Sequence, residues 1–387
     1  MLIPVGLYTL LLFLQGWTSS GFLVRRLNVG SISESLSLKL ATSSVSKPHN
    51  FSWQQTMLRI KDPAVSVPFY EKNFGFTLIH RYDFPQWSFS LYFMATIPDS
   101  EKASLPTPGT VESEKYLWTM NGTCLELTHN HGSENDEKFQ VSSGNKEPYR
   151  GFGHIAVMTP DVYAASKELE EVGKVAFQKR PDEGRMKGLA FALDPDGYWI
   201  EIVVRSEAAL QAVTNKFTFA QTMKRVKDPV KSLHFYRDLM GMTLLRETHI
   251  GKGTPDGFSL YFLATLTPED LARLGPPPSD ITSPEASEYI KCMFGPILEL
   301  THNHGTENDP EFSYYNGNDQ DKDQVRGFGH IGFLCDDLDG TCADLEAKGV
   351  AFKKKPQEGG MRGLAFAYDP DNYWVEIIQR AGLKLVE

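Results

Sequence analysis

The chain contains an internal duplication, and this feature constrains its fold more than any other. Three pairs of segments match closely: 54–78 with 220–244, 149–158 with 325–334, and 186–203 with 361–378. The offset between the copies is 166 residues in the first pair and 175 in the last, so the copies differ mainly in loop length. Repetition at a nearly fixed period is typical of repeated structural units. The sequence therefore predicts two similar domains, 51–204 and 217–381, joined by a linker at 205–216.

Each half divides into two smaller units of the same plan. In the first unit "TMLRIKD" reads as a strand, and Asp62-Pro63 predicts the start of a helix that Gly75 ends. Further strands of this unit are predicted at 76–84, 89–96, 116–120 and 124–129. The second unit repeats the plan around a helix at 161–173. The prediction is an α+β fold of four tandem βαβββ modules, whose curved mixed sheets pack in pairs and leave a concave face open to a ligand.

The first 50 residues differ in kind from the rest. An apolar run at 1–17 is too short to span a bilayer comfortably, and a Ser-rich segment that carries Arg25 and Arg26 follows it. A signal-like core before a transit-like segment resembles the bipartite leader of proteins sent to plastids of secondary origin. A mitochondrial presequence or a secretion signal is the alternative. We therefore predict that residues 1–50 are a targeting leader and that the protein resides in such a plastid.

Charge and cysteine content exclude several classes of protein. The chain has 39 basic and 49 acidic residues and a net charge of −10, which argues against nucleic acid or an anionic membrane surface as a partner. An anionic ligand would need a local cluster of Arg and Lys. The four cysteines form no C-x-x-C pair and are too few for a disulfide scaffold. They are predicted to be reduced residues of the core.

Four polar residues of the first half interrupt apolar strand patterns: Gln55, Glu126, His154 and Glu201. Each glutamate lies between two apolar residues and so faces the opposite side of its strand, where burial is costly unless a positive charge meets it. The same residue types recur in the second half at Gln221, Glu299, His330 and Glu376. One amide, one imidazole and two carboxylates favour a divalent ion. The lack of cysteine ligands indicates a catalytic rather than a structural metal site.

Six motifs carry a resemblance to a known family: "QQTMLRIKDP", "FSLYF", "LELTHN", "RGFGHI", "MKGLAF" and "DPDGYWIEI". Over about residues 51–203 and 217–379 the chain resembles glyoxalase I, the lactoylglutathione lyase of the vicinal oxygen chelate superfamily. The ligands of that family fall on all eight polar residues named above. In that family a site joins the Gln/Glu pair of one subunit to the His/Glu pair of the other.

The resemblance implies two metal sites between the two halves of one chain. Site A would contain Gln55, Glu126, His330 and Glu376, and site B would contain Gln221, Glu299, His154 and Glu201. The chain would then act as a monomer that is a covalent pseudo-dimer. The implied cofactor is Zn²⁺, two ions per chain, and Ni²⁺ or another divalent ion is the alternative.

The resemblance also implies the reaction. The substrate would be the hemithioacetal of methylglyoxal and glutathione, and proton transfer through an enediolate would give S-D-lactoylglutathione. The catalytic base would be Glu376 in site A and Glu201 in site B, with Glu126 and Glu299 holding the ion or assisting. Such an enzyme detoxifies methylglyoxal.

Further residues match family positions that contact the substrate. For site A these are Arg59, Asn130, Arg326, Lys354 and Met361, and for site B they are Arg225, Asn303, Arg150, Lys179, Arg185 and Met186. The cations among them would meet the two carboxylates of glutathione. Leu189, Phe191, Leu364 and Phe366 would wall the pockets. Arg185 has Gly360 as its counterpart, so site A lacks this cation.

Two other functions remain open within the same superfamily. An epimerase that acts on an acyl-coenzyme A would use similar proton transfer, but would not need the "LELTHN" and "RGFGH" motifs. A non-enzymatic module that sequesters a ligand would not need the eight metal ligands. An iron dioxygenase is disfavoured because Gln55 stands where a histidine would be required.

Overall fold

The chain was analysed as a computed structural model, which describes residues 48–209, 215–254, 256–319, 325–380, 382 and 384–385. The fold described below belongs to the unit formed by residues 45–387. Most of the predicted leader at 1–50 and residues 210–214 of the predicted linker therefore lie outside the described residues.

Four modules follow one another along the described chain. Module 1 contains β1 (Ser52–Ile60), α1 (Pro63–Phe74), β2 (Thr77–Phe84), β3 (Phe89–Ala95), α2 (Asp99–Lys102), α3 (Val111–Thr119) and β4 (Cys124–Asn130). After β5 (Val141–Ser142), module 2 contains β6 (Phe152–Thr159), α4 (Val162–Glu171), β7 (Phe177–Lys179), β8 (Ala190–Leu193) and β9 (Trp199–Val204).

The second half repeats this order. Module 3 contains β10 (Thr218–Arg225), α5 (Pro229–Leu233) with a π-helical continuation (His234–Leu239), β11 (Thr243–Ile250), β12 (Phe258–Ala264), α6 (Pro268–Leu274), α7 (Pro284–Lys291) and β13 (Ile297–Asn303). Module 4 contains β14 (Arg326–Cys335), α8 (Leu338–Ala347), β15 (Phe352–Lys354), β16 (Met361–Arg362), β17 (Leu364–Tyr368) and β18 (Trp374–Gln379), and β19 (Lys384–Leu385) follows it.

Local sequence signals explain the helix boundaries. The Asp62 carboxylate accepts a hydrogen bond from the Ala64 N–H at 2.8 Å, and Gly75 ends α1 in the left-handed conformation with φ of 68°. Asp161 caps α4 in the same manner, through the Ala164 N–H at 3.0 Å. Both predicted helices are thereby confirmed.

The predicted strand at 116–120 is wrong. Residues 116–119 form the end of α3, which begins after Thr110 with a capping box that includes Ser113. Leu117 and Trp118 are buried under this helix. A short apolar run fits either a strand or one face of a helix, so its periodicity could not separate the two.

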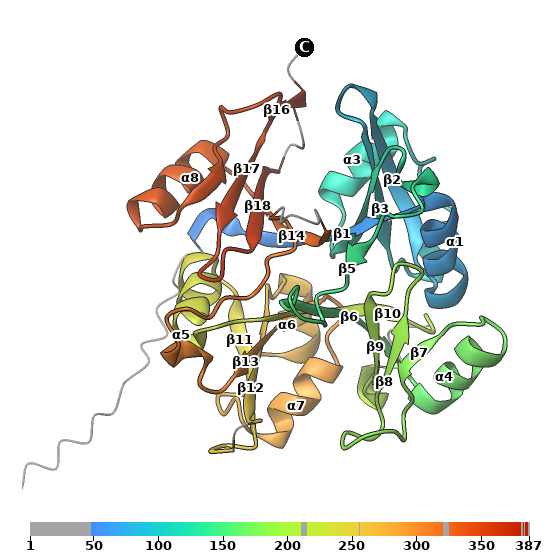
Figure 1. Ribbon diagram of the computed structural model, residues 1–387, viewed down its shortest axis with the longest axis vertical. Coiled ribbons are helices and arrows are strands. Elements are labelled where there is room, and N and C mark those ends of the chain that lie inside the picture. Colours follow the sequence, from blue (N-terminus) through green and yellow to red (C-terminus); the bar gives the residue numbers. More distant parts are fainter. Residues whose placement is uncertain are drawn as a thin grey trace, which may run out of the picture. The chain divides into compact units, whose positions relative to one another are not determined.

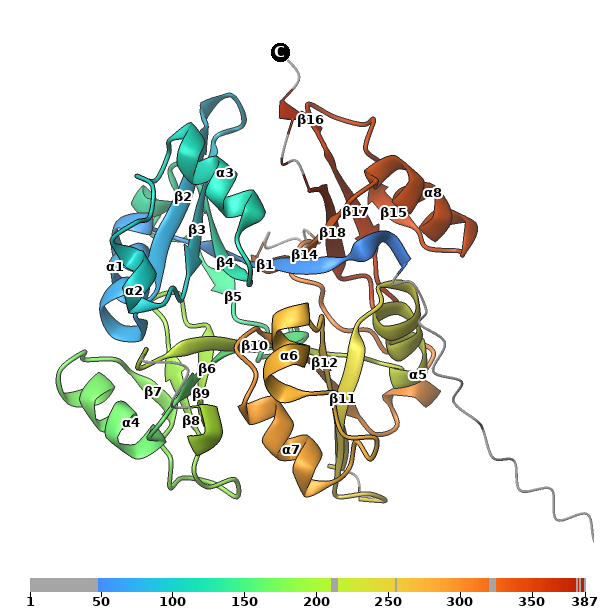
Figure 2. The ribbon, with the colours of Figure 1, turned by 180° about the vertical axis from the view of Figure 1, so that it is seen from behind.

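The two halves of the chain exchange modules to build two mixed sheets. One sheet has the order β15-β17-β18-β14-β1-β4-β3-β2 and so combines module 4 with module 1. The other has the order β11-β12-β13-β10-β6-β9-β8-β7 and combines module 3 with module 2. Figure 1 shows the first pair above the second, and the view from behind in Figure 2 shows the same arrangement. The predicted α+β fold of tandem modules is confirmed, and each sheet belongs to both halves.

Glycines allow two pairs of backbone segments from different halves of the chain to approach each other closely. A Cβ on Gly327 would lie 1.9 Å from the Ser142 carbonyl oxygen, and one on Gly151 would lie 2.0 Å from that of Tyr315. The "RGFGH" motif therefore needs glycine at this position. The rings of Phe152 and Phe328 stack on each other, with their centres 4.9 Å apart.

Two related polar clusters lie in the core beneath the helices. In the first half the Tyr70 hydroxyl donates to Asp194 at 2.8 Å, and burial raises the pKa of Asp194 to about 7. In the second half the Tyr236 hydroxyl donates to Asp369 at 2.8 Å. There the fully buried Lys224 also pairs with Asp369, in a position that leucine occupies in the first half.

No helix of the described residues is long and apolar enough to cross a bilayer. All four cysteines are buried and free of disulfides, as predicted.

Candidate active sites

Site A joins strands from both halves of the chain. Because β1 pairs with β14 and with β4, and β14 pairs with β18, the side chains of Gln55, Glu126, His330 and Glu376 come together on one sheet. The Gln55 amide donates to Glu126 at 2.6 Å and to Glu376 at 2.7 Å. His330 Nε2 lies 3.2 Å from the Glu126 carboxylate and 3.0 Å from that of Glu376.

Site B repeats this geometry in the other sheet. The Gln221 amide donates to Glu201 at 2.7 Å and to Glu299 at 2.8 Å. His154 Nε2 lies 3.3 Å from the Glu201 carboxylate and 3.6 Å from that of Glu299. The structure therefore brings the eight polar residues of the sequence analysis together in the two groups of four that were expected.

Both clusters concentrate negative charge in a buried place. All eight side chains are less than a tenth exposed. Burial opposes protonation of His330, but the charges of Glu376 and Glu126 outweigh it and raise its pKa to about 9. Glu201 and Glu299 likewise overcome burial and raise the pKa of His154 to about 9. Each cluster thus favours a positive charge between its two carboxylates.

The residues present fit a divalent ion. Among the described residues, the buried Gln55 Oε1 has no hydrogen-bond partner, and neither does His154 Nε2, although two carboxylates lie beside it. Unsatisfied buried polar atoms are rare in proteins unless another group meets them. Each cluster offers two carboxylates, an imidazole and an amide, which suits zinc, nickel or a related ion.

Two threonines missed by sequence reasoning support the clusters. The Thr128 hydroxyl donates to Glu126 at 3.3 Å, and the Thr301 hydroxyl donates to Glu299 at 3.4 Å. Each threonine lies two residues after its glutamate, so both face the same side of the strand. That spacing was visible in "LELTHN" and could have identified them.

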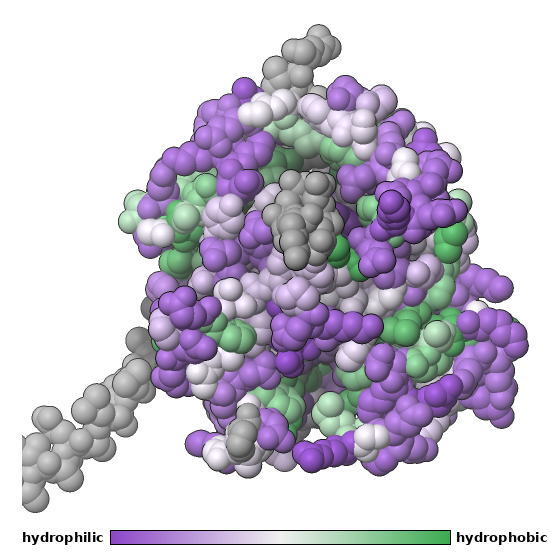
Figure 3. Space-filling model, in the orientation of Figure 1, coloured by the Kyte–Doolittle hydropathy of each residue, from purple (hydrophilic) through white to green (hydrophobic). Residues whose placement is uncertain are grey.

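Site B opens into a cavity of about 960 Å³. Its lining includes apolar and polar residues from both modules. The space-filling view shows apolar residues within the lower half of the molecule, bordered by hydrophilic ones (Figure 3). Of the residues predicted to contact the substrate at site B, the ones that line this cavity are Arg150, Met186, Arg225 and Asn303, together with the predicted wall residues Leu189 and Phe191.

Two predicted substrate contacts of site B lie outside the cavity. Lys179 donates instead to the Leu189 carbonyl oxygen at 2.7 Å, which holds the backbone before β8. Arg185 is exposed on the loop before β8 and does not line the cavity. Lys179 ends strand β7, where the backbone carbonyl oxygen of Leu189 accepts its hydrogen bond.

The equivalent arginines of the two sites also bind backbone of the other half. Arg225 donates to the Phe152 carbonyl oxygen at 3.0 Å and to Asn145 at 3.0 Å. Arg59, which is 8% exposed, donates to the Gly327 carbonyl oxygen at 3.2 Å and to Asn318 at 2.9 Å. Both arginines therefore fix the loop that precedes the histidine strand of their site.

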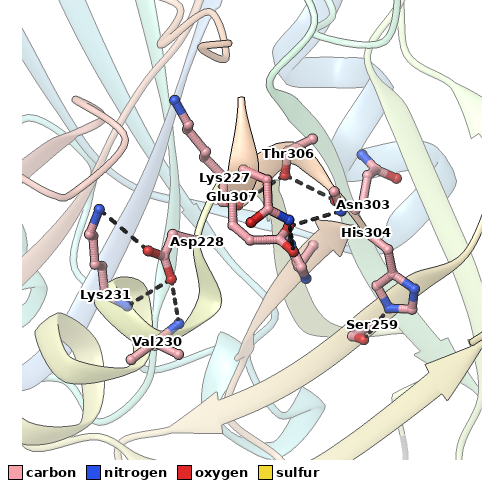
Figure 4. Close-up of polar contacts among 12 residues, drawn as sticks. Lys227, Asp228, Val230, Lys231, Ser259, Asn303, His304, Thr306 and Glu307 are labelled. Carbon is pink, nitrogen blue, oxygen red and sulfur yellow. Dashed lines mark hydrogen bonds and ion pairs between the residues drawn. The ribbon is translucent and has the colours of Figure 1, made fainter. Parts of the chain in front are cut away.

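Hydrogen bonds hold the turn after β13 (Figure 4), and Asn303 at its start lines the cavity. The Thr306 hydroxyl donates to the Asn303 and Lys227 carbonyl oxygens, each at 2.9 Å. The Asn303 amide donates to the Tyr314 hydroxyl at 2.7 Å, and Tyr314 lines the same cavity. In site A, Asn130 stands at the equivalent end of β4 and is half-buried.

The remaining predicted contacts of site A lie on or beside module 4. Lys354 donates to the Leu364 carbonyl oxygen at 2.9 Å, as Lys179 does to its counterpart. Arg326 begins β14 and Met361 lies in β16, which pairs with β19 near the C-terminus. A Cβ on Gly360 would lie 2.8 Å from the Trp87 ring, so the loop of module 4 approaches module 1 closely where the other half carries Arg185. Phe366 packs against His330, with the centres of the two rings 5.3 Å apart.

Comparisons with known proteins agree with this fold. The sequence model of the Glyoxalase/Bleomycin resistance protein/Dioxygenase superfamily matches residues 53–202 and 218–377. Because the match covers most of both halves, the chain is a protein of this superfamily. The chain is 40% identical over 330 residues to "Glyoxalase I" of Saccharomyces cerevisiae, which covers 84% of this chain and 90% of that one.

A second relative and a solved structure extend the comparison. The chain is 38% identical over 338 residues to "Lactoylglutathione lyase" of Schizosaccharomyces pombe, covering 87% of this chain and 99% of that one. The crystal structure of glyoxalase I from Zea mays shares the fold with a TM-score of 0.58 at 21% identity, covering 86% of this chain and 93% of that one. The chain belongs to the glyoxalase I family.

Proposed function

We propose that the chain is a metal-dependent glyoxalase I that converts the hemithioacetal of methylglyoxal and glutathione to S-D-lactoylglutathione. The observation that carries this proposal is the pair of complete Gln–Glu–His–Glu clusters, each built from both halves of the chain. The two relatives named above carry this activity in their names. Formation of thioester absorbance from glutathione and methylglyoxal tests the proposal directly.

The residues of each cluster can perform the proton transfer. The substrate carbon that bears sulfur loses a proton to Glu376 in site A or to Glu201 in site B, and the same carboxyl group returns it to the neighbouring carbon. Burial of the carboxylate excludes water, which would otherwise exchange with the transferred proton. A bound divalent ion would supply Lewis-acid stabilisation of the negative charge that develops on the substrate oxygens. Glu126 and Glu299 would help to hold the ion.

Glutathione binds, in this proposal, at the polar end of each site. In site B Arg150, Arg225 and Asn303 line the cavity, and in this proposal they lie closest to the glutathione carboxylates. Arg59, Asn130 and Arg326 are the counterparts in site A. The alternatives, an epimerase or a ligand-sequestering module, gain no support from the contacts of either cluster.

The proposed cofactor is Zn²⁺, with Ni²⁺ as the alternative. Each mature chain is expected to bind two ions, because both clusters are complete and each lies within one chain. Metal analysis of the purified protein should give two ions per chain, and a strong chelator should remove them together with activity. One ion per chain, unchanged by replacement of His154, would contradict the expectation. Sedimentation should show a monomer, because neither site needs a second chain.

We also propose that residues 1–50 form a targeting leader, with a plastid of secondary origin as the destination. The repeated modules begin with β1 at Ser52, so a protein that starts near Lys47 is expected to fold and to retain full activity. Melting temperature and turnover of the full-length and shortened proteins measure this. Loss of activity in a well-folded shortened protein would refute it. A fluorescent fusion to residues 1–50 that stays in the cytosol would refute the targeting proposal.

A further inference from the structure

A cation that the proposed reaction does not use faces the cavity of site B. Arg246 lies in β11 and lines this cavity beside the carboxylates. Its guanidinium lies 5.6 Å from the centre of the Phe262 ring, and Phe262 pairs with Glu299 across the sheet. Within the described parts of the chain, Arg246 has no hydrogen-bond or ion-pair partner. A half-buried guanidinium without an acceptor is suited to bind an anionic group of a ligand.

A second cation lines the cavity at the end of α7. Lys291 has one acidic neighbour among the described residues, Glu288, at 3.6 Å, and both side chains are more than a third exposed. Such an exposed ion pair contributes little to stability, so Lys291 can pair with the anionic group of a ligand instead. Ile290 and Met158, which line the cavity nearby, provide an apolar wall.

Site A has an imidazole and an indole, His80 and Trp118, at the two equivalent positions, and the His80 Nε2 is buried with no hydrogen-bond partner among the described residues. His80 pairs with Phe93 as Arg246 pairs with Phe262, and it is 3% exposed with a 2.6 Å hydrogen bond to the Ser113 hydroxyl. Burial lowers the pKa of His80, which favours the neutral ring.

The counterpart of Lys291 is Trp118, whose indole N–H donates to the Tyr82 hydroxyl at 2.9 Å. Trp118 belongs to an apolar cluster with Leu334 and Ile378. In the second half alanine, at position 286, replaces Ser113, so the partner of His80 has changed together with His80 itself. The two sites therefore differ in charge and polarity at matched positions.

We propose that Arg246 and Lys291 make site B selective for 2-oxoaldehydes whose side chain ends in an anionic group, whereas site A takes uncharged ones. The inference rests on the proposed glyoxalase I function and names the substrate class of each site. In this arrangement glutathione occupies the end of the cavity near Arg225, and the aldehyde side chain extends past Glu299 toward the two cations. The reaction itself is unchanged and redox-neutral, because one proton moves between adjacent carbons.

The test uses proteins with one working site. Glu376→Gln leaves site B, and Glu201→Gln leaves site A. Turnover of the methylglyoxal hemithioacetal is measured first in both proteins. If neither turns it over, the proposed function fails. If both do, inhibition is compared for S-(4-carboxybutyl)glutathione and S-pentylglutathione, two stable thioethers that differ in a terminal carboxylate or methyl group.

Site B is expected to bind the carboxylate thioether about ten-fold more tightly than the methyl thioether, since one charge-assisted contact is gained. Site A is expected to show the reverse preference. The rates with hemithioacetals of 4,5-dioxopentanoate and 2-oxopentanal should follow the same order. Equal inhibition constants for the two thioethers at site B would overturn the selectivity while leaving the proposed function intact.

Further substitutions in the Glu376→Gln protein, in which only site B works, test whether Arg246 determines selectivity or only supports the structure. Arg246→His, which introduces the residue of site A, should weaken binding of the carboxylate thioether about ten-fold and that of the methyl thioether less than two-fold. Arg246→Lys should restore much of the difference, and Lys291→Met should give a smaller loss of the same kind. The control is Arg180→His, which removes an exposed arginine outside the cavity. Equal losses for both thioethers would show that Arg246 positions Glu299 instead, and would overturn the proposal.

Discussion

Replacing Glu201 and Glu376 together by glutamine is expected to abolish turnover of the methylglyoxal hemithioacetal, whereas each single replacement should leave one site working. Glutamine keeps the size of glutamate but cannot accept the substrate proton, and loss of a general base typically costs about 10²- to 10⁴-fold in rate. The two carboxylates lie in different sheets, so neither replacement touches the other cluster. Each single mutant should therefore retain the kcat and KM of its remaining site.

Turnover is measured by thioester absorbance, and bound metal is measured in parallel to detect loss of the ion. Glu171→Gln is the matched control, because this glutamate is exposed on α4 and lies outside both clusters. If either single mutant with normal metal content lost all turnover, the sites would not be independent. If the double mutant kept substantial activity, the assignment of the base would be wrong.

Replacing Lys224 by leucine is expected to destabilise the protein by about 3–5 kcal/mol at pH 8, and by much less in mild acid. Lys224 is fully buried, pairs with Asp369, and lies 4.4 Å from the centre of the Tyr236 ring. Its loss leaves a buried carboxylate without a cation. The first half of the chain shows the outcome, because Leu58 occupies the equivalent position and the buried Asp194 has its pKa raised to about 7.

The pH dependence follows from the sign of that shift. A buried carboxyl group without a cation, such as Asp194 with its pKa raised to about 7, keeps in the folded state a proton that the unfolded chain releases above about pH 4. The mutant should then be nearly as stable as the parent in mild acid and should lose stability as the pH rises through about 7. Urea unfolding at about pH 5.5 and about pH 8 measures the difference.

Two further variants make this result interpretable. Adding Asp369→Asn to the mutant removes the unpaired carboxylate and should recover much of the loss at pH 8. Lys231→Leu, which removes an exposed lysine from the same module, should change stability by no more than about 0.5 kcal/mol. A loss of stability that is equal at both pH values would contradict the role assigned to the buried charge.

The sequence alone determined the features that repeat or that depend on neighbouring residues. The duplication defined two similar halves, and the order of elements within each half defined two modules. The capping residues Asp62 and Asp161 fixed where two helices begin, because a cap is a local hydrogen bond. The eight polar residues were also evident, since each glutamate interrupts an apolar strand and each group of four recurs in order. The family resemblance implied that each site combines residues from both halves, and each of the two sheets does combine strands from both halves.

Only the tertiary structure decided what depends on contacts distant in the sequence. Residues 116–119 became helical because Leu117 and Trp118 could be buried from that helix, which a short apolar run does not reveal. Lys179 donates to a backbone carbonyl oxygen, whereas Arg246, which the sequence did not single out, lines the cavity from an edge strand. A long cationic side chain takes its direction from the surfaces and acceptors around it, and these come from modules far apart in the chain.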